Sequence, residues 1–343
     1  MKKLPLTSAA PRPDHSSPWI IILAGGCGSR LRGLTRVDES EWVPKQYCSL
    51  SGGLTLLQGA LDRAAAIAHR DRILVVVTEK HRRWWSSLLR TLPSRNILVQ
   101  PEGRGTANGI LLPVLDIAKR ETDACIAIMP SDHDVQDESP LRRSLLAAAR
   151  YSRRHPDLVS LLGIEPGFPD PELGYILPQD TGFIGPAPVQ RFIEKPSLSE
   201  AAQLLAVGSL WNAFIMVGAV QGLLRLFGPE YARARAVMLR ALASGDFDPN
   251  GAHAGDYAGL IERDFSRHIL RGQEDRLRVW RVPECGWSDL GTVDRVASAL
   301  RRFPSFPLAD PPADEDGTIN LAARYHALGN RSATAGSLGT SAG

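Results

Sequence analysis

An unbroken apolar run at residues 19–24 leads directly into a glycine-rich segment at residues 25–28, and this junction limits the folds open to the chain. The apolar run predicts a buried strand. Glycines, which have no Cβ atom, let backbone N–H groups approach an anion closely. Arg30 and Lys45 follow, and their charges suit a polyphosphate. The junction therefore predicts a strand that ends in a phosphate-binding turn rather than an ordinary strand-to-helix turn.

Apolar strand segments alternate with amphipathic helical segments over the first half of the chain. Predicted strands cover residues 19–24, 72–78, 96–100, 124–129 and 158–163. Predicted helices cover residues 54–69, 80–92, 106–120 and 141–154. This alternation is typical of a parallel sheet that is covered on both faces and binds ligands at the carboxyl ends of its strands. The predicted fold class is α/β, with a Rossmann-like mixed, mainly parallel sheet flanked by helices.

The pattern changes after residue 163, where antiparallel strands are expected. Predicted strands cover residues 175–178, 188–194, 210–217 and 276–283, and predicted helices cover residues 219–227, 230–244, 254–265 and 292–302. We expect one domain over residues 18–303, with a nucleotide half at 18–164 and a substrate half at 165–303. Residues 1–17 are expected to be a disordered leader and residues 304–343 a loose tail, because both are polar and rich in small residues or proline.

Composition and charge exclude several classes of protein. The 40 basic and 37 acidic residues leave a net charge of +3, which is too balanced to indicate a nucleic-acid or anionic-membrane partner. No segment approaches the roughly 18 apolar residues of a membrane span. The cysteines, at positions 27, 48, 125 and 285, have no metal-ligand spacing, which is typical of reduced thiols. We therefore expect a cytoplasmic protein with no nucleic-acid or membrane partner.

Two aspartates are expected to lie beside the glycine turn, on neighbouring strand ends. Asp132 follows the predicted strand at 124–129, and Asp289 precedes the predicted helix at 292–302. Mg²⁺ prefers one or two carboxylates together with the phosphates of its substrate, so the pair predicts a magnesium site. Either aspartate alone would also suit a turn or a helix cap. His133 is expected to be a turn residue rather than a general base, because a phosphate nucleophile is largely anionic at neutral pH.

Further motifs follow in order along the chain. They are Pro44-Lys45-Gln46, Gln100-Pro101-Glu102-Gly103-Arg104-Gly105-Thr106-Ala107, Pro130-Ser131-Asp132-His133, Leu173-Gly174-Tyr175-Ile176, Phe192-Ile193-Glu194-Lys195-Pro196, Trp211-Asn212 and Trp287-Ser288-Asp289-Leu290-Gly291. Together with the glycine turn, this ordered set resembles the sugar-1-phosphate nucleotidyltransferase superfamily. The resemblance is closest to the mannose-1-phosphate guanylyltransferases, because the lysine–glutamine pair at 45–46 is more typical of that branch.

The resemblance implies a fold of the nucleotide-diphospho-sugar transferase type and a reaction. A hexose 1-phosphate, with mannose 1-phosphate expected, attacks the α-phosphorus of a nucleoside triphosphate, with GTP expected, and pyrophosphate leaves. The implied catalytic residues are Arg30, Lys45, Asp132, Lys195 and Asp289, with Asp132 and Asp289 as metal ligands. The implied nucleotide-binding residues are Leu23, Ala24, Gly25, Gly26, Gly28, Ser29, Arg30, Gln100, Arg104, Gly105 and Thr106. The implied sugar-phosphate-binding residues are Gly174, Tyr175, Glu194, Lys195 and Asn212.

The chain departs from the usual family pattern at three places. Arg-Gly at 32–33 stands where Trp-Pro is usual, and Gln100 and Gly105 stand where glutamate and asparagine are usual. Ala213 and Phe214 stand where Ser-Gly is usual. The base, the sugar and the formation of a homodimer stay open on this evidence.

Two other functions also stay open. The Asp-His-Asp segment at 132–134 has the Asp-x-Asp spacing of metal-dependent glycosyltransferases. The departures are also compatible with a catalytically silent paralogue that binds a nucleotide sugar and regulates a partner. Pyrophosphate release separates both from a nucleotidyltransferase, because neither alternative produces it.

Overall fold

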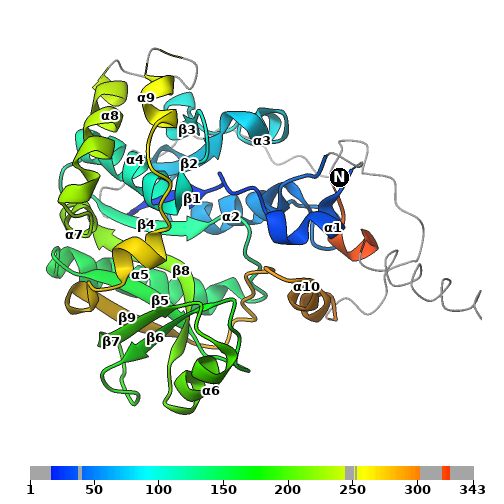
Figure 1. Cartoon of the computed structure of the whole chain (residues 1–343), viewed down its shortest axis with the longest axis vertical. Coiled ribbons are helices and arrows are strands. Elements are labelled where there is room, and N and C mark those ends of the chain that lie inside the picture. The colour runs from blue at the N-terminus through cyan, green and yellow to red at the C-terminus, as the bar shows by residue number, and fades with distance from the viewer. Residues whose placement is uncertain (1–16, 38–40, 244–250, 252, 302–318, 325–343) are drawn as a thin grey trace, which may run out of the picture.

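The computed structural model describes residues 17–37, 41–243, 251, 253–301 and 319–324. In this part of the chain, one nine-stranded sheet lies between two layers of helices (Figure 1). The strands are β1 (Trp19–Leu23), β2 (Ile73–Thr78), β3 (Ile97–Gln100), β4 (Cys125–Pro130), β5 (Val159–Ile164), β6 (Gly174–Pro178), β7 (Pro186–Glu194), β8 (Leu210–Ala219) and β9 (Leu277–Val282). The α-helices are α1 (Arg32–Thr35), α2 (Leu56–Ala65), α3 (Arg82–Leu88), α4 (Gly105–Arg120), α5 (Glu138–Arg154), α6 (Leu198–Ala206), α7 (Val220–Arg225), α8 (Ala232–Ala243), α9 (Ala254–Ala258) and α10 (Val293–Leu300).

The sheet confirms the predicted fold class. Its strand order is β3-β2-β1-β4-β8-β5-β9-β7-β6. Strands β1 to β4 pair in parallel, and β5 pairs in parallel with β9, whereas β7 and β8 run against their neighbours. Leu23 at the end of β1 lies opposite Pro130 at the end of β4. The glycine turn and the segment that carries Asp132 therefore start side by side.

Strand β1 is apolar throughout because both faces of the sheet are covered. Ile20 and Ile22 pack into a core with α2, α3, α5 and α10, whereas Ile21 packs on the opposite face with α4, α7 and α8. All three isoleucines are fully buried. A strand with two buried faces loses the alternation of apolar and polar residues, which explains the unbroken run in the sequence.

Three helices differ from the sequence-based expectation, and the first of them, the short α1, lies where no helix was predicted. Helix α9 ends at Ala258 and Gly259 follows, so it is shorter than the predicted helix at 254–265. Helix α6 was not predicted, although Ser197 caps it by accepting a hydrogen bond from the backbone N–H of Glu200. Because α9 ends at Ala258, the segment after it is not helical and extends to α4, where the Arg263 backbone packs on Gly105.

The expected tail contains a packed segment. Ile319 and Leu321 are buried, the N–H of Ser49 donates to the carbonyl of Ile319, and the N–H of Leu321 donates to the carbonyl of Ser49. Residues 319–324 are therefore not loose, because their apolar side chains cover an edge of the core. The rest of the predicted tail, residues 304–318 and 325–343, and the predicted leader up to residue 16 lie outside the described residues.

The two predicted halves share one sheet, since β4 of the first half pairs directly with β8 of the second. The boundary between them near residue 164 stays a prediction.

Candidate active site

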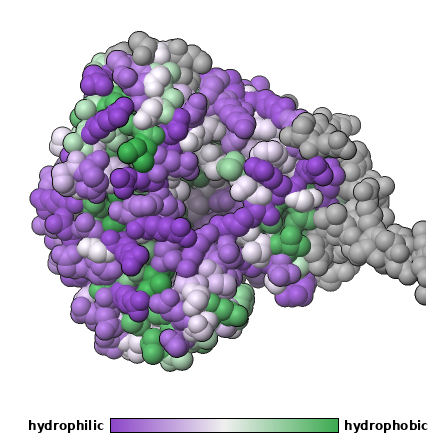
Figure 2. Space-filling view, in the orientation of Figure 1, coloured by the Kyte–Doolittle hydropathy of each residue, from purple (hydrophilic) through white to green (hydrophobic). Residues whose placement is uncertain are grey.

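Two adjoining cavities open where β1, β3 and β4 end. The central cavity has a volume of about 410 Å³ and the Gln100 cavity about 590 Å³. They share Leu23, Gly26 and Thr106 in their linings. The face of the molecule in Figure 2 is hollowed near its middle, and the surface around the hollow is largely hydrophilic. The lining of the central cavity includes the cationic side chains of Arg30, Lys45 and Lys195, which suit an anionic ligand.

Lys45 and Gln46 hold the glycine turn in shape. Gly28 has a φ of 60°, and a Cβ atom there would lie 2.9 Å from the backbone nitrogen of Lys45. The Gln46 Nε2 donates to the carbonyls of Ala24 at 2.9 Å and of Gly26 at 2.8 Å. The glycine turn and the Pro-Lys-Gln motif, separate in the sequence, therefore form one structural unit.

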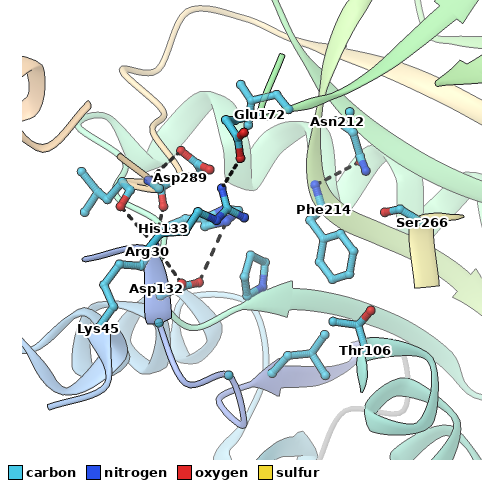
Figure 3. Close-up of a pocket in the computed structure, with 18 of the residues that line it drawn as sticks. Arg30, Lys45, Thr106, Asp132, His133, Glu172, Asn212, Phe214, Ser266 and Asp289 are labelled. Carbon is cyan, nitrogen blue, oxygen red and sulfur yellow. Dashed lines mark hydrogen bonds and ion pairs between the residues drawn. The ribbon is translucent and has the colours of Figure 1, made fainter. Parts of the chain in front are cut away.

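The ammonium group of Lys45 connects both predicted metal ligands. Its Nζ lies 2.8 Å from Asp132 Oδ2 and donates to the backbone carbonyls of Asp289 at 2.5 Å and Leu290 at 3.4 Å (Figure 3). Lys45 is only 5% exposed. We call Lys45, Asp132 and Asp289 the aspartate end of the central cavity.

Asp132 and Asp289 both line the central cavity, but the chain brings them there in a different way from the one predicted. Their strands, β4 and β9, are separated by β8 and β5 in the sheet, so the prediction of neighbouring strand ends is wrong. The loop after β9 crosses back instead, and Asp134 and Ser288 exchange two backbone hydrogen bonds of 2.9 Å. Thr292 rather than Asp289 caps α10, which leaves the Asp289 carboxylate at the cavity.

Each of these aspartates lies beside a cation. Burial alone would raise the pKa of the Asp132 carboxyl, but the Lys45 ammonium outweighs this effect and lowers the pKa. Asp289 Oδ1 lies 2.7 Å from Nη1 of Arg295, a residue of α10. Two carboxylates, each paired with a cation, therefore line one recess.

His133 is uncharged at neutral pH. Burial lowers the pKa of its imidazole to about 4. Its Nδ1 accepts a hydrogen bond of 3.2 Å from Trp287 Nε1, and the two rings lie edge to face. A histidine held in this way fits the expected turn role.

Arg30 and Lys195 share a carboxylate. Nη1 of Arg30 lies 3.2 Å from Oε2 of Glu172, and Nζ of Lys195 lies 3.5 Å from the same oxygen. The side chains of Arg30 and Glu172 are about half exposed. The structure thus brings together two predicted phosphate-binding cations, through an acidic residue that the sequence analysis did not single out.

We call Glu194, Lys195, Asn212 and Phe214 the glutamate end of the central cavity, which all four line. A Cβ atom on Gly174 would lie 2.6 Å from Glu194 Oε2, so the carboxylate fits closely over this glycine. Burial, and then the charge of Asp264, raise the pKa of Glu194 to about 7. This carboxyl therefore changes its charge near neutral pH.

The Gln100 cavity contains the predicted base-binding segment. Gln100 is 3% exposed, and its Nε2 donates to the hydroxyl of Tyr257 in α9 at 3.1 Å. Its Oε1 lies near Gly25 in the cavity wall. Gly105 has a φ of 76°, and a Cβ atom there would overlap the carbonyl oxygen of Arg263. Close packing on this backbone explains the glycine at position 105.

The cavities gather most of the predicted site residues. The central cavity is lined by Leu23, Gly26, Gly28, Ser29, Arg30, Lys45, Thr106, Asp132, Gly174, Glu194, Lys195, Asn212 and Asp289, and the Gln100 cavity adds Gly25, Gln100, Arg104 and Gly105. Ala24 and Tyr175 line neither cavity. Both are fully buried, and the Tyr175 hydroxyl accepts a hydrogen bond from the backbone N–H of Asp170. The Tyr175 side chain therefore lies in the core, and the assignment of Tyr175 to sugar binding stays a prediction.

Asp134, the second aspartate of the Asp-x-Asp segment, also lies outside the linings of both cavities. Its backbone pairs with Ser288 in the bridge between the two loops. The segment thus presents one carboxylate to the central cavity, through Asp132, rather than two.

Sequence reasoning missed several contributing residues. Gln46 belongs to the Pro-Lys-Gln motif, but the sequence analysis assigns it no role. Glu172 directly precedes the Leu-Gly-Tyr-Ile motif, and this position could have identified it. Arg295 gave no signal, because its contact with Asp289 depends on the path of the loop before α10.

Comparisons with known proteins agree on one family. Residues 20–304 match the family model described as nucleotidyl transferase. The xanthan biosynthesis protein XanB of Xanthomonas campestris pv. campestris (strain B100) is 36% identical over 197 residues, which are 56% of this chain and 40% of that protein. The mannose-1-phosphate guanylyltransferase of Escherichia coli (strain K12) is 30% identical over 293 residues, which are 81% of this chain and 59% of that protein.

A solved structure gives the same result. The crystal structure of mannose-1-phosphate geranyltransferase from Thermus thermophilus superposes on this chain with a TM-score of 0.69 at 26% identity. The superposed region covers 85% of this chain and 80% of that chain. The matched regions span 40% and 59% of the two curated relatives. Among the residues that the structure describes, no helix combines the length and apolar character of a membrane span.

Proposed function

The chain belongs to the nucleotidyl transferase family, and from this membership we propose that it joins a hexose 1-phosphate to a nucleoside triphosphate with release of pyrophosphate. Mannose 1-phosphate and GTP are the proposed substrates, and GDP-mannose is the proposed product. The relative from Escherichia coli, a mannose-1-phosphate guanylyltransferase, supports this pair because its similarity extends over 81% of the chain.

One observation carries the proposal. The glycine turn, the aspartate end and the glutamate end line a single cavity. Two substrates that both carry phosphate repel one another, so their reaction depends mainly on positioning and on compensating charge. Arg30, Lys45 and Lys195 supply positive charge around this cavity.

The donor atoms at the aspartate end fit Mg²⁺. The described residues contain no group of three or more histidine, cysteine, aspartate or glutamate side chains placed to hold a metal ion. An ion held by Asp132 and Asp289 would therefore need further ligands from the substrates. Mg²⁺ is commonly bound in this way, by one or two carboxylates together with substrate phosphates. When bound, the ion would offset negative charge on the reacting phosphates.

The chain's own residues then have separate roles. The backbone amides of the glycine turn hold the triphosphate, and the Arg30 guanidinium stabilises the departing pyrophosphate by bidentate contacts. Lys195 holds the phosphate of the sugar. A phosphate oxygen of the sugar phosphate attacks the α-phosphorus, and the bond to the bridging oxygen of the β-phosphate breaks. The attacking phosphate is already anionic, so His133 is not required as a base.

Gln100 is the proposed reader of the base. Its amide nitrogen is engaged by Tyr257, so its carbonyl oxygen is the group that faces the Gln100 cavity. A carbonyl oxygen accepts a hydrogen bond, and guanine offers N–H donors along its edge. Gln100 therefore favours a base with a donor at that position, which is consistent with GTP.

The test is a matrix of pyrophosphate release by the full chain. The four nucleoside triphosphates are combined with mannose, glucose and galactose 1-phosphates, in the presence of Mg²⁺ and after its chelation. We expect the highest kcat/KM with GTP and mannose 1-phosphate, and no turnover after chelation.

Other outcomes contradict specific parts of the proposal. Highest activity with another pair would change the assigned substrates, and full activity after chelation would remove the metal. Sugar transfer from GDP-mannose to an acceptor without pyrophosphate release would indicate the glycosyltransferase. Binding of GDP-mannose without turnover of any pair would indicate the silent paralogue.

A further inference from the structure

Backbone strain is concentrated at the central cavity. Among the described residues, the non-glycine residues with a positive φ are Lys195 at 51°, Phe214 at 54° and Leu290 at 48°. All three line the central cavity. Each such conformation is energetically unfavourable and persists where the surrounding structure enforces it, commonly at functional sites. Lys195 brings a positive charge to the cavity, and the carbonyl of Leu290 accepts a hydrogen bond from Lys45. The Phe214 side chain has no charge and no polar group, so its role must be a different one.

Several contacts hold Phe214 in this conformation. Its N–H donates to Asn212 Oδ1 at 3.1 Å, which closes a tight local turn. Its ring lies edge to face with Phe265, with centroids 6.5 Å apart and planes at 83°. Phe265 is fully buried, and its N–H donates to the Thr106 hydroxyl at 2.7 Å. These contacts hold the backbone of Phe214 in place and set its ring against Phe265.

The fixed ring occupies space at the glutamate end. Figure 3 shows it projecting into the cavity between Asn212 and Thr106. The Glu194 carboxylate, which fits closely over Gly174, lines the same cavity. A sugar bound at the glutamate end would therefore share this space with the phenyl ring and the Glu194 carboxylate.

We propose that Phe214 is a specificity-determining residue, which restricts the glutamate end to unsubstituted hexose 1-phosphates and excludes those with a bulky N-acyl group. The inference rests on the proposed function, because it assigns the glutamate end to the sugar. Shape alone carries this discrimination, since the ring can form no hydrogen bond that would select among sugar hydroxyls.

The experiment compares three variants of the full chain. Phe214→Gly removes the ring and also relieves the backbone strain, because glycine adopts a positive φ readily. Phe214→Ala removes the ring but keeps the strain. Phe183→Ala is the matched control, because Phe183 lies outside the central and Gln100 cavities and packs against Arg281. Thermal unfolding of each variant confirms that it is folded.

The readout is kcat/KM for mannose 1-phosphate against N-acetylglucosamine 1-phosphate and N-acetylmannosamine 1-phosphate, at fixed GTP. We expect the preference for the unsubstituted sugar to fall by about tenfold or more in both Phe214 variants, and to stay unchanged in Phe183→Ala. An unchanged preference in folded Phe214→Gly, or an equal change in the control, would overturn the inference.

Failure of the proposed function is distinguishable from failure of the inference. Wild-type protein that releases no pyrophosphate with any pair contradicts the function. The inference is then tested by calorimetric titration with the same three sugar phosphates. Tighter binding of either N-acetyl compound to Phe214→Gly than to wild type supports it, and equal binding to both proteins overturns it.

Discussion

The aspartate end and the glutamate end of the central cavity are built in different ways. At the aspartate end, buried Lys45 joins Asp132 to the backbone at Asp289, and hydrogen bonds connect three distant segments of the chain. At the glutamate end, Lys195 and Phe214 adopt left-handed backbone conformations. One end is fixed by charge and hydrogen bonds, whereas the other is shaped by local backbone strain.

This difference separates reaction from recognition. Phosphate chemistry requires the same charges whatever the sugar, so an end built of mutually dependent ionic contacts tolerates little change. Substrate choice depends on shape, and the glutamate end also contains the departure at Phe214 from the usual family pattern. We therefore expect substitutions at the aspartate end to affect kcat, and substitutions at the glutamate end to affect KM for the sugar phosphate.

The largest effect is expected for Asp132→Ala. Removal of this carboxylate should lower kcat by about 100- to 1,000-fold, by analogy with the loss of one oxyanion-hole donor. Pyrophosphate release at saturating GTP, mannose 1-phosphate and Mg²⁺ measures the loss. Asp123→Ala, which removes an exposed aspartate outside both cavities, is the matched control. Wild-type kcat in a folded Asp132→Ala protein would remove the metal assignment.

The sequence predicts some features of the aspartate end better than others. The glycine turn, Asp132 and the parallel strands before it follow from local patterns, because an apolar run with both faces buried has a distinctive composition. The convergence of Asp132 with Asp289 was also predicted, but for the wrong reason. Strand order is a non-local property, and the insertion of β8 and β5 between β4 and β9 leaves no local trace.

The glutamate end was less predictable for a related reason. Tyr175 alternates with its neighbours along β6, and sequence alone does not say which face of the strand meets the cavity. The structure turns its side chain into the core, while Gly174 beside it lines the cavity. The left-handed conformation of Phe214 likewise depends on contacts with Asn212 and Phe265.

The second prediction concerns stability and the charge of Glu194. Burial, and then the charge of Asp264, raise the pKa of Glu194 from 4.5 to about 7. Between pH 4.5 and pH 7, the carboxyl therefore keeps its proton in the folded state but has lost it in the unfolded state. The free energy of unfolding should therefore fall as pH rises from 4.5 to 7. After a discount for partial exposure, the contribution is about 2 kcal/mol.

Chemical denaturation of wild type and Glu194→Gln across this pH range measures that contribution. The difference in unfolding free energy between the two proteins isolates Glu194 from groups with other pH dependence, such as His81, whose pKa burial lowers to about 4. Asp264→Asn should flatten the wild-type curve, because it removes a negative charge beside Glu194. Parallel curves for wild type and Glu194→Gln would contradict the raised pKa.

The third prediction tests the division of roles directly. Lys195→Ala should raise KM for mannose 1-phosphate by about tenfold, which corresponds to about 1.4 kcal/mol of lost interaction with the phosphate. KM for GTP should change much less. Steady-state kinetics with each substrate varied in turn measures both values, and Lys195→Arg should recover part of the affinity. An effect confined to GTP would reverse the assignment of the two ends.

The smallest effect is expected at Glu172, which connects Arg30, beside the glycine turn, to Lys195 of the glutamate end. This carboxylate pairs with both Arg30 and Lys195 in the structure, so it competes with substrate phosphates for the same cations. Glu172→Gln should therefore lower KM for mannose 1-phosphate, by about fivefold at most, because exposed ion pairs contribute about 1 kcal/mol or less. Inhibition by inorganic phosphate should strengthen in parallel. A higher KM in this variant would show instead that Glu172 positions Arg30 and Lys195 to bind the substrate, and does not compete with the substrate for them.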